Sequence, residues 1–184
     1  AGMVESRGQH KATAVVASSN TVKFEVQDDV KADVLNVLPT MRAGAIAVQS
    51  GLANMNARWC GVNYQNFESS IAKDIHVIGD SIQIAPAMPK SGHMANSHAK
   101  VCAAAIVAEL NGWAINAAPM LTNTCYSFVD AKTVIHVASV HEYVAAEKTF
   151  KTVAGSGGVS PGPTEVEGNY AWNWARTIWA DALT

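Results

Sequence analysis

The sequence IHVIGDSIQIAPAMPKSGHMANSHAKVCAAAIVAELN, residues 75–111, decides the fold that the rest of the chain surrounds. Residues 75–78 are apolar and of strand length, and Gly79-Asp80 follows them at once. After a loop interrupted by two prolines, the Ala-rich residues 94–110 predict a helix that ends at Gly112. Strand, loop and helix in this order are typical of a ligand-binding unit in an α/β protein, where ligands lie beyond the carboxyl ends of strands.

Two features of this unit suit the binding of a polar organic molecule. Asp80 would extend its carboxylate past the strand end, where it can accept hydrogen bonds from a polyol. The helix start after Lys90-Ser91 would present free N–H groups and a partial positive charge. The plainer interpretations remain open at this point: Asp80 as the cap of a turn, and Lys90 as a solvated loop lysine.

Composition excludes several classes of protein. Apolar residues make up 49% of the 184 residues and charged residues 15%, which is typical of a globular protein. A net charge of −2 gives no electrostatic reason to expect nucleic acid as a partner. The longest apolar stretch, residues 101–110, contains Glu109 and falls short of the roughly 20 residues of a membrane span. Because the sequence begins with Ala1, we expect a processed chain or part of a longer one.

The cysteines and histidines predict no metal site. Cys60, Cys102 and Cys125 form no C-x-x-C pair, and their odd number leaves at least one thiol without an intrachain partner. His93 and His98 are five residues apart, a spacing that does not share a helix face. His136 and His141 have an odd separation on a predicted strand, so we interpret both as ordinary strand residues on opposite faces.

The remaining sequence predicts an α+β or partial α/β fold in three parts. These parts are an antiparallel meander in residues 1–40, the strand–loop–helix unit in residues 41–120, and a C-terminal antiparallel hairpin lobe with a terminal helix in residues 121–184. The predicted strands and helix outside the central unit are 11–16, 21–26, 33–38, 125–129, 134–144, 148–153 and 167–183. Residues 113–124 are predicted to be a connector, and 155–163 a turn and linker. No G-x-G-x-x-G turn is present, so the fold is only part of a dinucleotide-binding one.

Several motifs together resemble one family. They are His76-Val77-Ile78-Gly79-Asp80, Met88-Pro89-Lys90-Ser91-Gly92, Ala95-Asn96-Ser97, Lys100-Val101, Asn123-Thr124-Cys125-Tyr126-Ser127 and Tyr170-Ala171-Trp172 with Trp174. In this order they are similar to the flavin-binding subunit of flavocytochrome c sulfide dehydrogenase, a flavoprotein of the glutathione-reductase type that pairs with a c-type cytochrome. The resemblance extends over essentially the whole chain.

The resemblance implies roles for individual residues. Gly79 and Asp80 match the second FAD motif, whose aspartate binds the ribityl chain. Pro89-Lys90-Ser91 precedes the helix that points at the flavin pyrimidine edge. Cys125 matches one cysteine of a redox-active disulfide beside the flavin, and neither Cys60 nor Cys102 matches its partner.

Two further residues are candidates for an electron path from flavin to haem. Trp174 matches a tryptophan near that route, although an aromatic residue that packs a terminal helix would explain it nearly as well. His93 stands where the family has a tyrosine near the flavin. This departure puts the path itself in question.

The resemblance implies a function for the parent protein. It would be a periplasmic oxidoreductase that oxidises sulfide with FAD and passes electrons to a c-type cytochrome subunit. The present residues alone would bind FAD weakly or not at all, would not turn over sulfide, and would self-associate through exposed apolar surface. Two alternatives remain: a short, non-catalytic cytochrome-binding or interaction module, and a related sulfide:quinone or NADH-type flavoprotein disulfide oxidoreductase.

Overall fold

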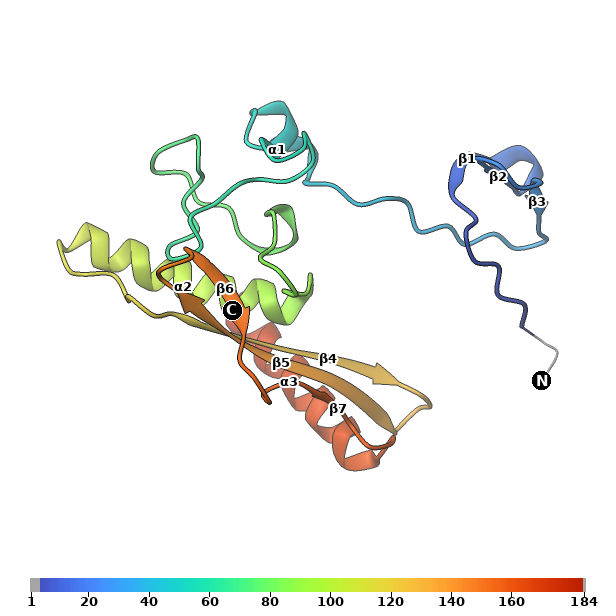
Figure 1. The fold of residues 1–184 in the computed structure, drawn as a ribbon. Helices are drawn as coiled ribbons and strands as arrows, with labels where there is room; N and C mark the ends of the chain where they lie inside the picture. Colours follow the sequence, from blue (N-terminus) through green and yellow to red (C-terminus); the bar gives the residue numbers. More distant parts are fainter. Residues whose placement is uncertain (1–3, 184) are drawn as a thin grey trace. The chain divides into compact units, whose positions relative to one another are not determined.

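The computed structural model describes residues 4–183, which form two compact units. The first unit ends at Met41 and the second begins at Arg42. Helices and antiparallel sheets occur together, so the predicted α+β class is confirmed (Figure 1). The three-part division at residues 40 and 120 stays a prediction.

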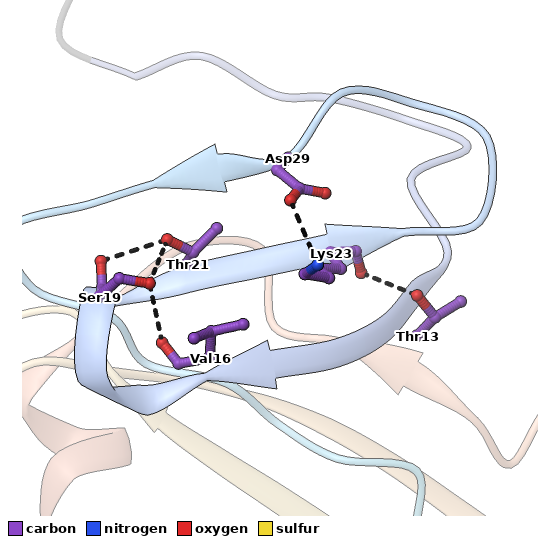
Figure 2. Close-up of polar contacts among 6 residues, drawn as sticks. All are labelled: Thr13, Val16, Ser19, Thr21, Lys23 and Asp29. Carbon is purple, nitrogen blue, oxygen red and sulfur yellow. Dashed lines mark hydrogen bonds and ion pairs between the residues drawn. The ribbon is translucent and has the colours of Figure 1, made fainter.

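The first unit is a three-stranded antiparallel meander in the order β1-β2-β3. Its elements are β1 (Ala12–Val16), a 3-10 turn (Ala17–Ser19), β2 (Thr21–Phe24) and β3 (Val30–Lys31). The Ser19 hydroxyl contacts the Thr21 hydroxyl at 2.9 Å at the turn, and Lys23 of β2 lies 4.0 Å from Asp29, the residue before β3 (Figure 2). The predicted hairpin is confirmed.

The prediction of a third strand at residues 33–38 is wrong. The third strand is the short β3, and Val34 and Leu38 beyond it are 87% and 90% exposed. A strand is stable only when a neighbour satisfies its backbone groups and covers one of its faces. Within the described residues, no strand pairs with residues 33–38.

The second unit contains one antiparallel sheet, whose strands differ in length, and two long helices (Figure 1). Its elements are α1 (Ala45–Gln49), a 3-10 turn η2 (Gly79–Ser81), α2 (Gly92–Leu110), β4 (Met120–Phe128), β5 (Val134–Val144), β6 (Thr149–Thr152), β7 (Gly158–Val159) and α3 (Glu165–Leu183). The central strand β5 pairs with β4 on one side and with β6 and β7 on the other.

Helix α2 forms where the sequence predicted it, but it begins at Gly92 rather than Met94. The side chain of Ser91 caps it by accepting a hydrogen bond from the Met94 N–H at 3.0 Å, which fixes the earlier start. At the other end Gly112 has φ +68, as the left-handed residue after a helix requires. The cap and the terminal glycine together define the helix.

One stripe of α2 faces the core. Its buried residues are Met94, His98, Cys102, Ala105 and Ala108. The spacings of three and four residues keep them on one side of the helix. They pack on a cluster that includes Phe67, Ile82, Leu121 and Phe150, each 0% exposed. Burying each phenylalanine contributes about 1.5–3 kcal/mol.

The predicted strand at residues 75–78 is not formed as a strand. Pairing is confined to one side, where Val77 donates to the Phe67 carbonyl at 3.0 Å and His76 makes a single bridge with Glu68. Ile75 and Ile78 are 46% and 39% exposed. A buried parallel strand needs partners on both edges and cover on both faces, and the described residues supply neither in full.

The C-terminal lobe largely follows its prediction. Strand β5 has the predicted bounds, 134–144, and β6 and α3 lie within two residues of theirs. Two details were wrong: β4 begins at Met120 inside the predicted connector, and β7 lies inside the predicted turn and linker. Helix α3 lies against the sheet, and a Cβ on Gly168 would come within 2.0 Å of the Lys132 carbonyl oxygen. Only glycine allows this approach.

Candidate functional site

The start of α2 is the point where the predicted site residues meet. The Ser91 hydroxyl accepts from the Met94 N–H and donates to the side-chain oxygen of Asn123 on β4. The Asn123 amide in turn donates to the Cys125 sulfur at 3.3 Å. A continuous chain of hydrogen bonds therefore links the helix cap to the thiol.

Cys125 is the only exposed cysteine of the three. Cys60 and Cys102 are 0% and 6% exposed, and burial raises the pKa of both thiols. Cys125 lies opposite Val137 on β5, and Val137 lies opposite Val159 on β7. Cross-strand partners share one face of a sheet, so the thiol lies in an apolar strip whose two valines are 51% and 66% exposed.

The other face of this part of the sheet carries α3. Trp174 lies with its ring centroid 6.1 Å from that of Tyr126 and 5.5 Å from that of His93. Tyr126 also contacts the ring of His136, which is hydrogen-bonded to Glu167 on α3. Both electron-path candidates, His93 and Trp174, therefore belong to one aromatic cluster, on the opposite side of β4 from the Cys125 side chain.

Helix α2 also covers the outer edge of β4. The His93 Nδ1 accepts from the Thr124 N–H at 3.0 Å, and the Ser97 hydroxyl donates to the Thr122 carbonyl at 3.1 Å. The two helix residues are four apart and so lie on one face of α2. They satisfy backbone groups that an edge strand would otherwise leave open. Burial lowers the pKa of His93, which favours the neutral ring needed for an acceptor nitrogen.

On its other side α2 holds the turn that contains Gly79 and Asp80. Gly79 is buried with φ +67, and its N–H donates to the Nδ1 of His98 at 3.1 Å. A Cβ at Gly79 would lie 3.2 Å from the Ala95 Cβ, so the turn approaches the helix closely. The next residue, Asp80, is exposed and extends from this fixed turn.

Lys90 is a half-buried residue bound to this turn. Its ammonium donates to the carbonyl oxygens of Asp80 and Ile82 at 2.5 and 2.9 Å and lies 3.7 Å from the centre of the Trp59 ring. Burial is the main cause that lowers its pKa, and the Asp80 carboxylate opposes that effect. Pro89 before it is also half-buried.

The structure thus brings most of the predicted residues together around the first turns of α2. Gly79, Asp80 and Lys90 lie on the turn side, Ser91 and Cys125 are joined through Asn123, and His93 lies at the β4 edge. Sequence reasoning missed Asn123 and His98 as connecting residues. Asn123 carried a signal, because it stands in the Asn-Thr-Cys-Tyr-Ser motif, whereas His98 carried none.

These residues fit a flavin. Gly79 allows a close turn with an exposed carboxylate after it, and the first N–H groups of a 19-residue helix have no partner within the helix. The apolar strip beside Cys125 suits a flat aromatic ring. In residues 4–183 no three His, Cys, Asp or Glu side chains gather as a metal ion would require. No helix in that range is long and apolar enough to cross a membrane.

Comparison with known families gives a match in the C-terminal part of the chain. Residues 117–183 match the family described as flavocytochrome c sulphide dehydrogenase, flavin-binding. The match covers a little over a third of the chain and includes Cys125 and Trp174. It is the family that the sequence motifs resemble, and flavin is its cofactor. Gly79, Asp80 and the residues 89–93 lie outside the matched range.

Proposed function

We propose that this chain supplies the C-terminal part of a flavin pocket in a sulfide-oxidising flavoprotein that passes electrons to a c-type cytochrome. The observation that carries the proposal is the hydrogen-bonded chain Ser91–Asn123–Cys125. It places an exposed thiol and a capped helix start beside each other, although they are 34 residues apart in the sequence. The family match of residues 117–183 supports the same conclusion.

Each residue would have a distinct part in holding FAD. Asp80 would accept hydrogen bonds from the ribityl hydroxyls. The start of α2 would favour negative charge on the ring by roughly 0.3–1 kcal/mol. The valines beside Cys125 would exclude water from the ring face. When bound, the flavin supplies a two-electron acceptor.

Cys125 would act in a disulfide with a second cysteine that lies outside these 184 residues. Attack by HS⁻ on one sulfur of that disulfide forms a persulfide and releases the other sulfur as a thiolate. The Asn123 amide donates toward the Cys125 sulfur, and such a donor interacts more strongly with a thiolate than with a neutral thiol. Asn123 would therefore favour the released, electron-rich state.

The aromatic residues of α3 support a second part of the proposal. Trp172 and Trp179 are 48% and 53% exposed, and their spacing of seven residues places them on one face of the helix. We assign this face to contact with the cytochrome subunit in the periplasm, and to self-association when that subunit is absent. The same face is the observation that favours the alternative, a non-catalytic interaction module.

FAD titration of the purified chain tests the proposal. The sequence allows weak binding or none, and the proposal requires the first of these: weak binding, roughly millimolar, that Asp80→Ala weakens several-fold further. Asp130→Ala is the matched control, because Asp130 lies in the β4–β5 turn and binds only its local backbone and Thr133. Binding that is absent, or equally weakened by both variants, would overturn the proposal. Reduction of cytochrome c by this chain on addition of sulfide would contradict its expected inactivity alone.

A further inference from the structure

His98 is a buried histidine whose contacts do not suit a purely packing role. It is 1% exposed, and its ring lies against Phe67 with the centroids 4.6 Å apart. Its Nδ1 accepts the Gly79 N–H at 3.1 Å, while its Nε2 has no partner among the described residues. Burying an unpaired polar nitrogen is costly, so an apolar side chain would fill this space more favourably. Compared with an apolar side chain, the imidazole provides one additional contact, the hydrogen bond from the Gly79 N–H.

The hydrogen bond from the Gly79 N–H forms with only one protonation state of the His98 ring. An Nδ1 that accepts a hydrogen bond carries no proton, so the neutral ring holds its proton on Nε2. Burial, together with the charges of Lys90 and His141, lowers the pKa of His98 to about 4. Lys90 and His141 are the titratable groups that act on it, from the loop before α2 and from β5. At neutral pH the ring is therefore a permanent acceptor.

The turn is held from two sides. His98 accepts from the N–H of Gly79, and Lys90 donates to the carbonyl oxygens of Asp80 and Ile82. The backbone before and after the Asp80 side chain is thereby fixed, although the carboxylate itself is exposed. Lys90 is the partly exposed half of this arrangement, and His98 is the buried half.

We propose that His98 is a positioning residue that sets the conformation of the Gly79-Asp80 turn, and with it the direction of the Asp80 carboxylate. The inference rests on the proposed function, because it assigns Asp80 to the flavin. Its structural half concerns only the Gly79 N–H and can be tested without a flavin. Its functional half concerns the affinity for FAD.

Amide hydrogen exchange at Gly79, measured by NMR on the full chain, tests the structural half. His98→Asn keeps an acceptor oxygen near the position of Nδ1 but loses the ring, whereas His98→Leu keeps apolar volume but loses the acceptor. We expect exchange at Gly79 to accelerate about tenfold or more in His98→Leu and to change much less in His98→Asn. The equally buried His141 provides a control, and His141→Leu should leave Gly79 unchanged. Equal acceleration in the Asn and Leu variants, or none in either, would overturn the inference.

A measurement on the unmodified protein covers the case in which the variants do not fold. The side-chain nitrogen shifts of His98 at neutral pH distinguish a bare Nδ1 from a protonated one. A bare Nδ1 is expected. A proton on Nδ1 would overturn the inference.

FAD affinity tests the functional half. We expect His98→Leu to weaken FAD binding by about as much as Asp80→Ala, and His98→Asn to restore most of the loss. If the unmodified chain binds no FAD, the proposed function fails while the exchange result at Gly79 still stands. If FAD binds His98→Leu normally although Gly79 exchanges faster, His98 does not position the ligand and the inference fails.

Discussion

Helix α2 holds two parts of the candidate site, and it holds them differently. On one side the turn at Gly79–Ser81 is held by the buried hydrogen bond from Gly79 to His98, by Lys90, and by the Cys60 N–H, which donates to the Ser81 carbonyl at 3.0 Å. On the other side β4 is bound by Ser91, His93 and Ser97, and it is also paired with β5 along nine residues. The turn therefore has few contacts that could replace a lost one, whereas the strand has many. Changes on the turn side should have the larger effects.

The largest effect we expect is the loss of stability that acid causes on the turn side of α2. The folded-state pKa of His98 is lowered from 6.5 to about 4, so the unfolded chain binds more protons between these values. The stability that neutral His98 provides is complete above pH 6.5 and is lost as the pH falls to about 4, in total about 3 kcal/mol. Urea denaturation across this range measures the loss.

The matched comparison uses the two histidines of α2. We expect His98→Asn to flatten the pH dependence of the unfolding free energy and His93→Asn to flatten it less, because His93 is only half-buried. A pH dependence unchanged by His98→Asn would contradict the assignment.

Gly79→Ala should have the next largest effect. Alanine at φ +67 costs about 1–2 kcal/mol, and the 3.2 Å approach to the Ala95 Cβ adds to that cost. Gly112 is the matched control, because its φ is +68 and nothing lies within 4 Å of its added Cβ. Urea denaturation should show a larger loss for Gly79→Ala than for Gly112→Ala. Equal losses at both glycines would mean that the contact with α2 is unimportant.

On the strand side, Ser91→Ala should cost about 1 kcal/mol of unfolding free energy, which is typical for loss of a helix cap. The buried Asn123 would also lose its partner at Oδ1. Ser97→Ala is the control, because Ser97 also bonds β4 but does not cap the helix. If thermal melts show the same loss of stability for both variants, the helix cap formed by Ser91 adds nothing to its bond with β4.

The same contrast explains what the sequence could predict. The Ala-rich run of α2, the terminator Gly112 and the alternation of β5 are local signals, and the structure confirms helix and strand there. Residues 75–78 carry an equally clear strand pattern but lack the neighbours that a buried strand needs, so a local signal misled. The connecting bonds are harder still, because Ser91 and Asn123 are 32 residues apart and Gly79 and His98 are 19 apart. Such polar partners meet only in the folded chain, and no periodic pattern in the sequence predicts which residues pair.

The smallest stability effect is expected at the exposed end of the site. Cys125→Ser should change the unfolding free energy by no more than about 0.5 kcal/mol, because the side chain is exposed and Asn123 can donate to a hydroxyl as well as to sulfur. Reactivity should respond instead. A thiol reagent should modify one cysteine in the native chain and all three after denaturation, since Cys60 and Cys102 are buried and free. Native Cys125→Ser should show no fast-reacting thiol. A fast reaction in that variant would mean that a second cysteine is accessible. Cys125 would then not be the single accessible thiol of the chain.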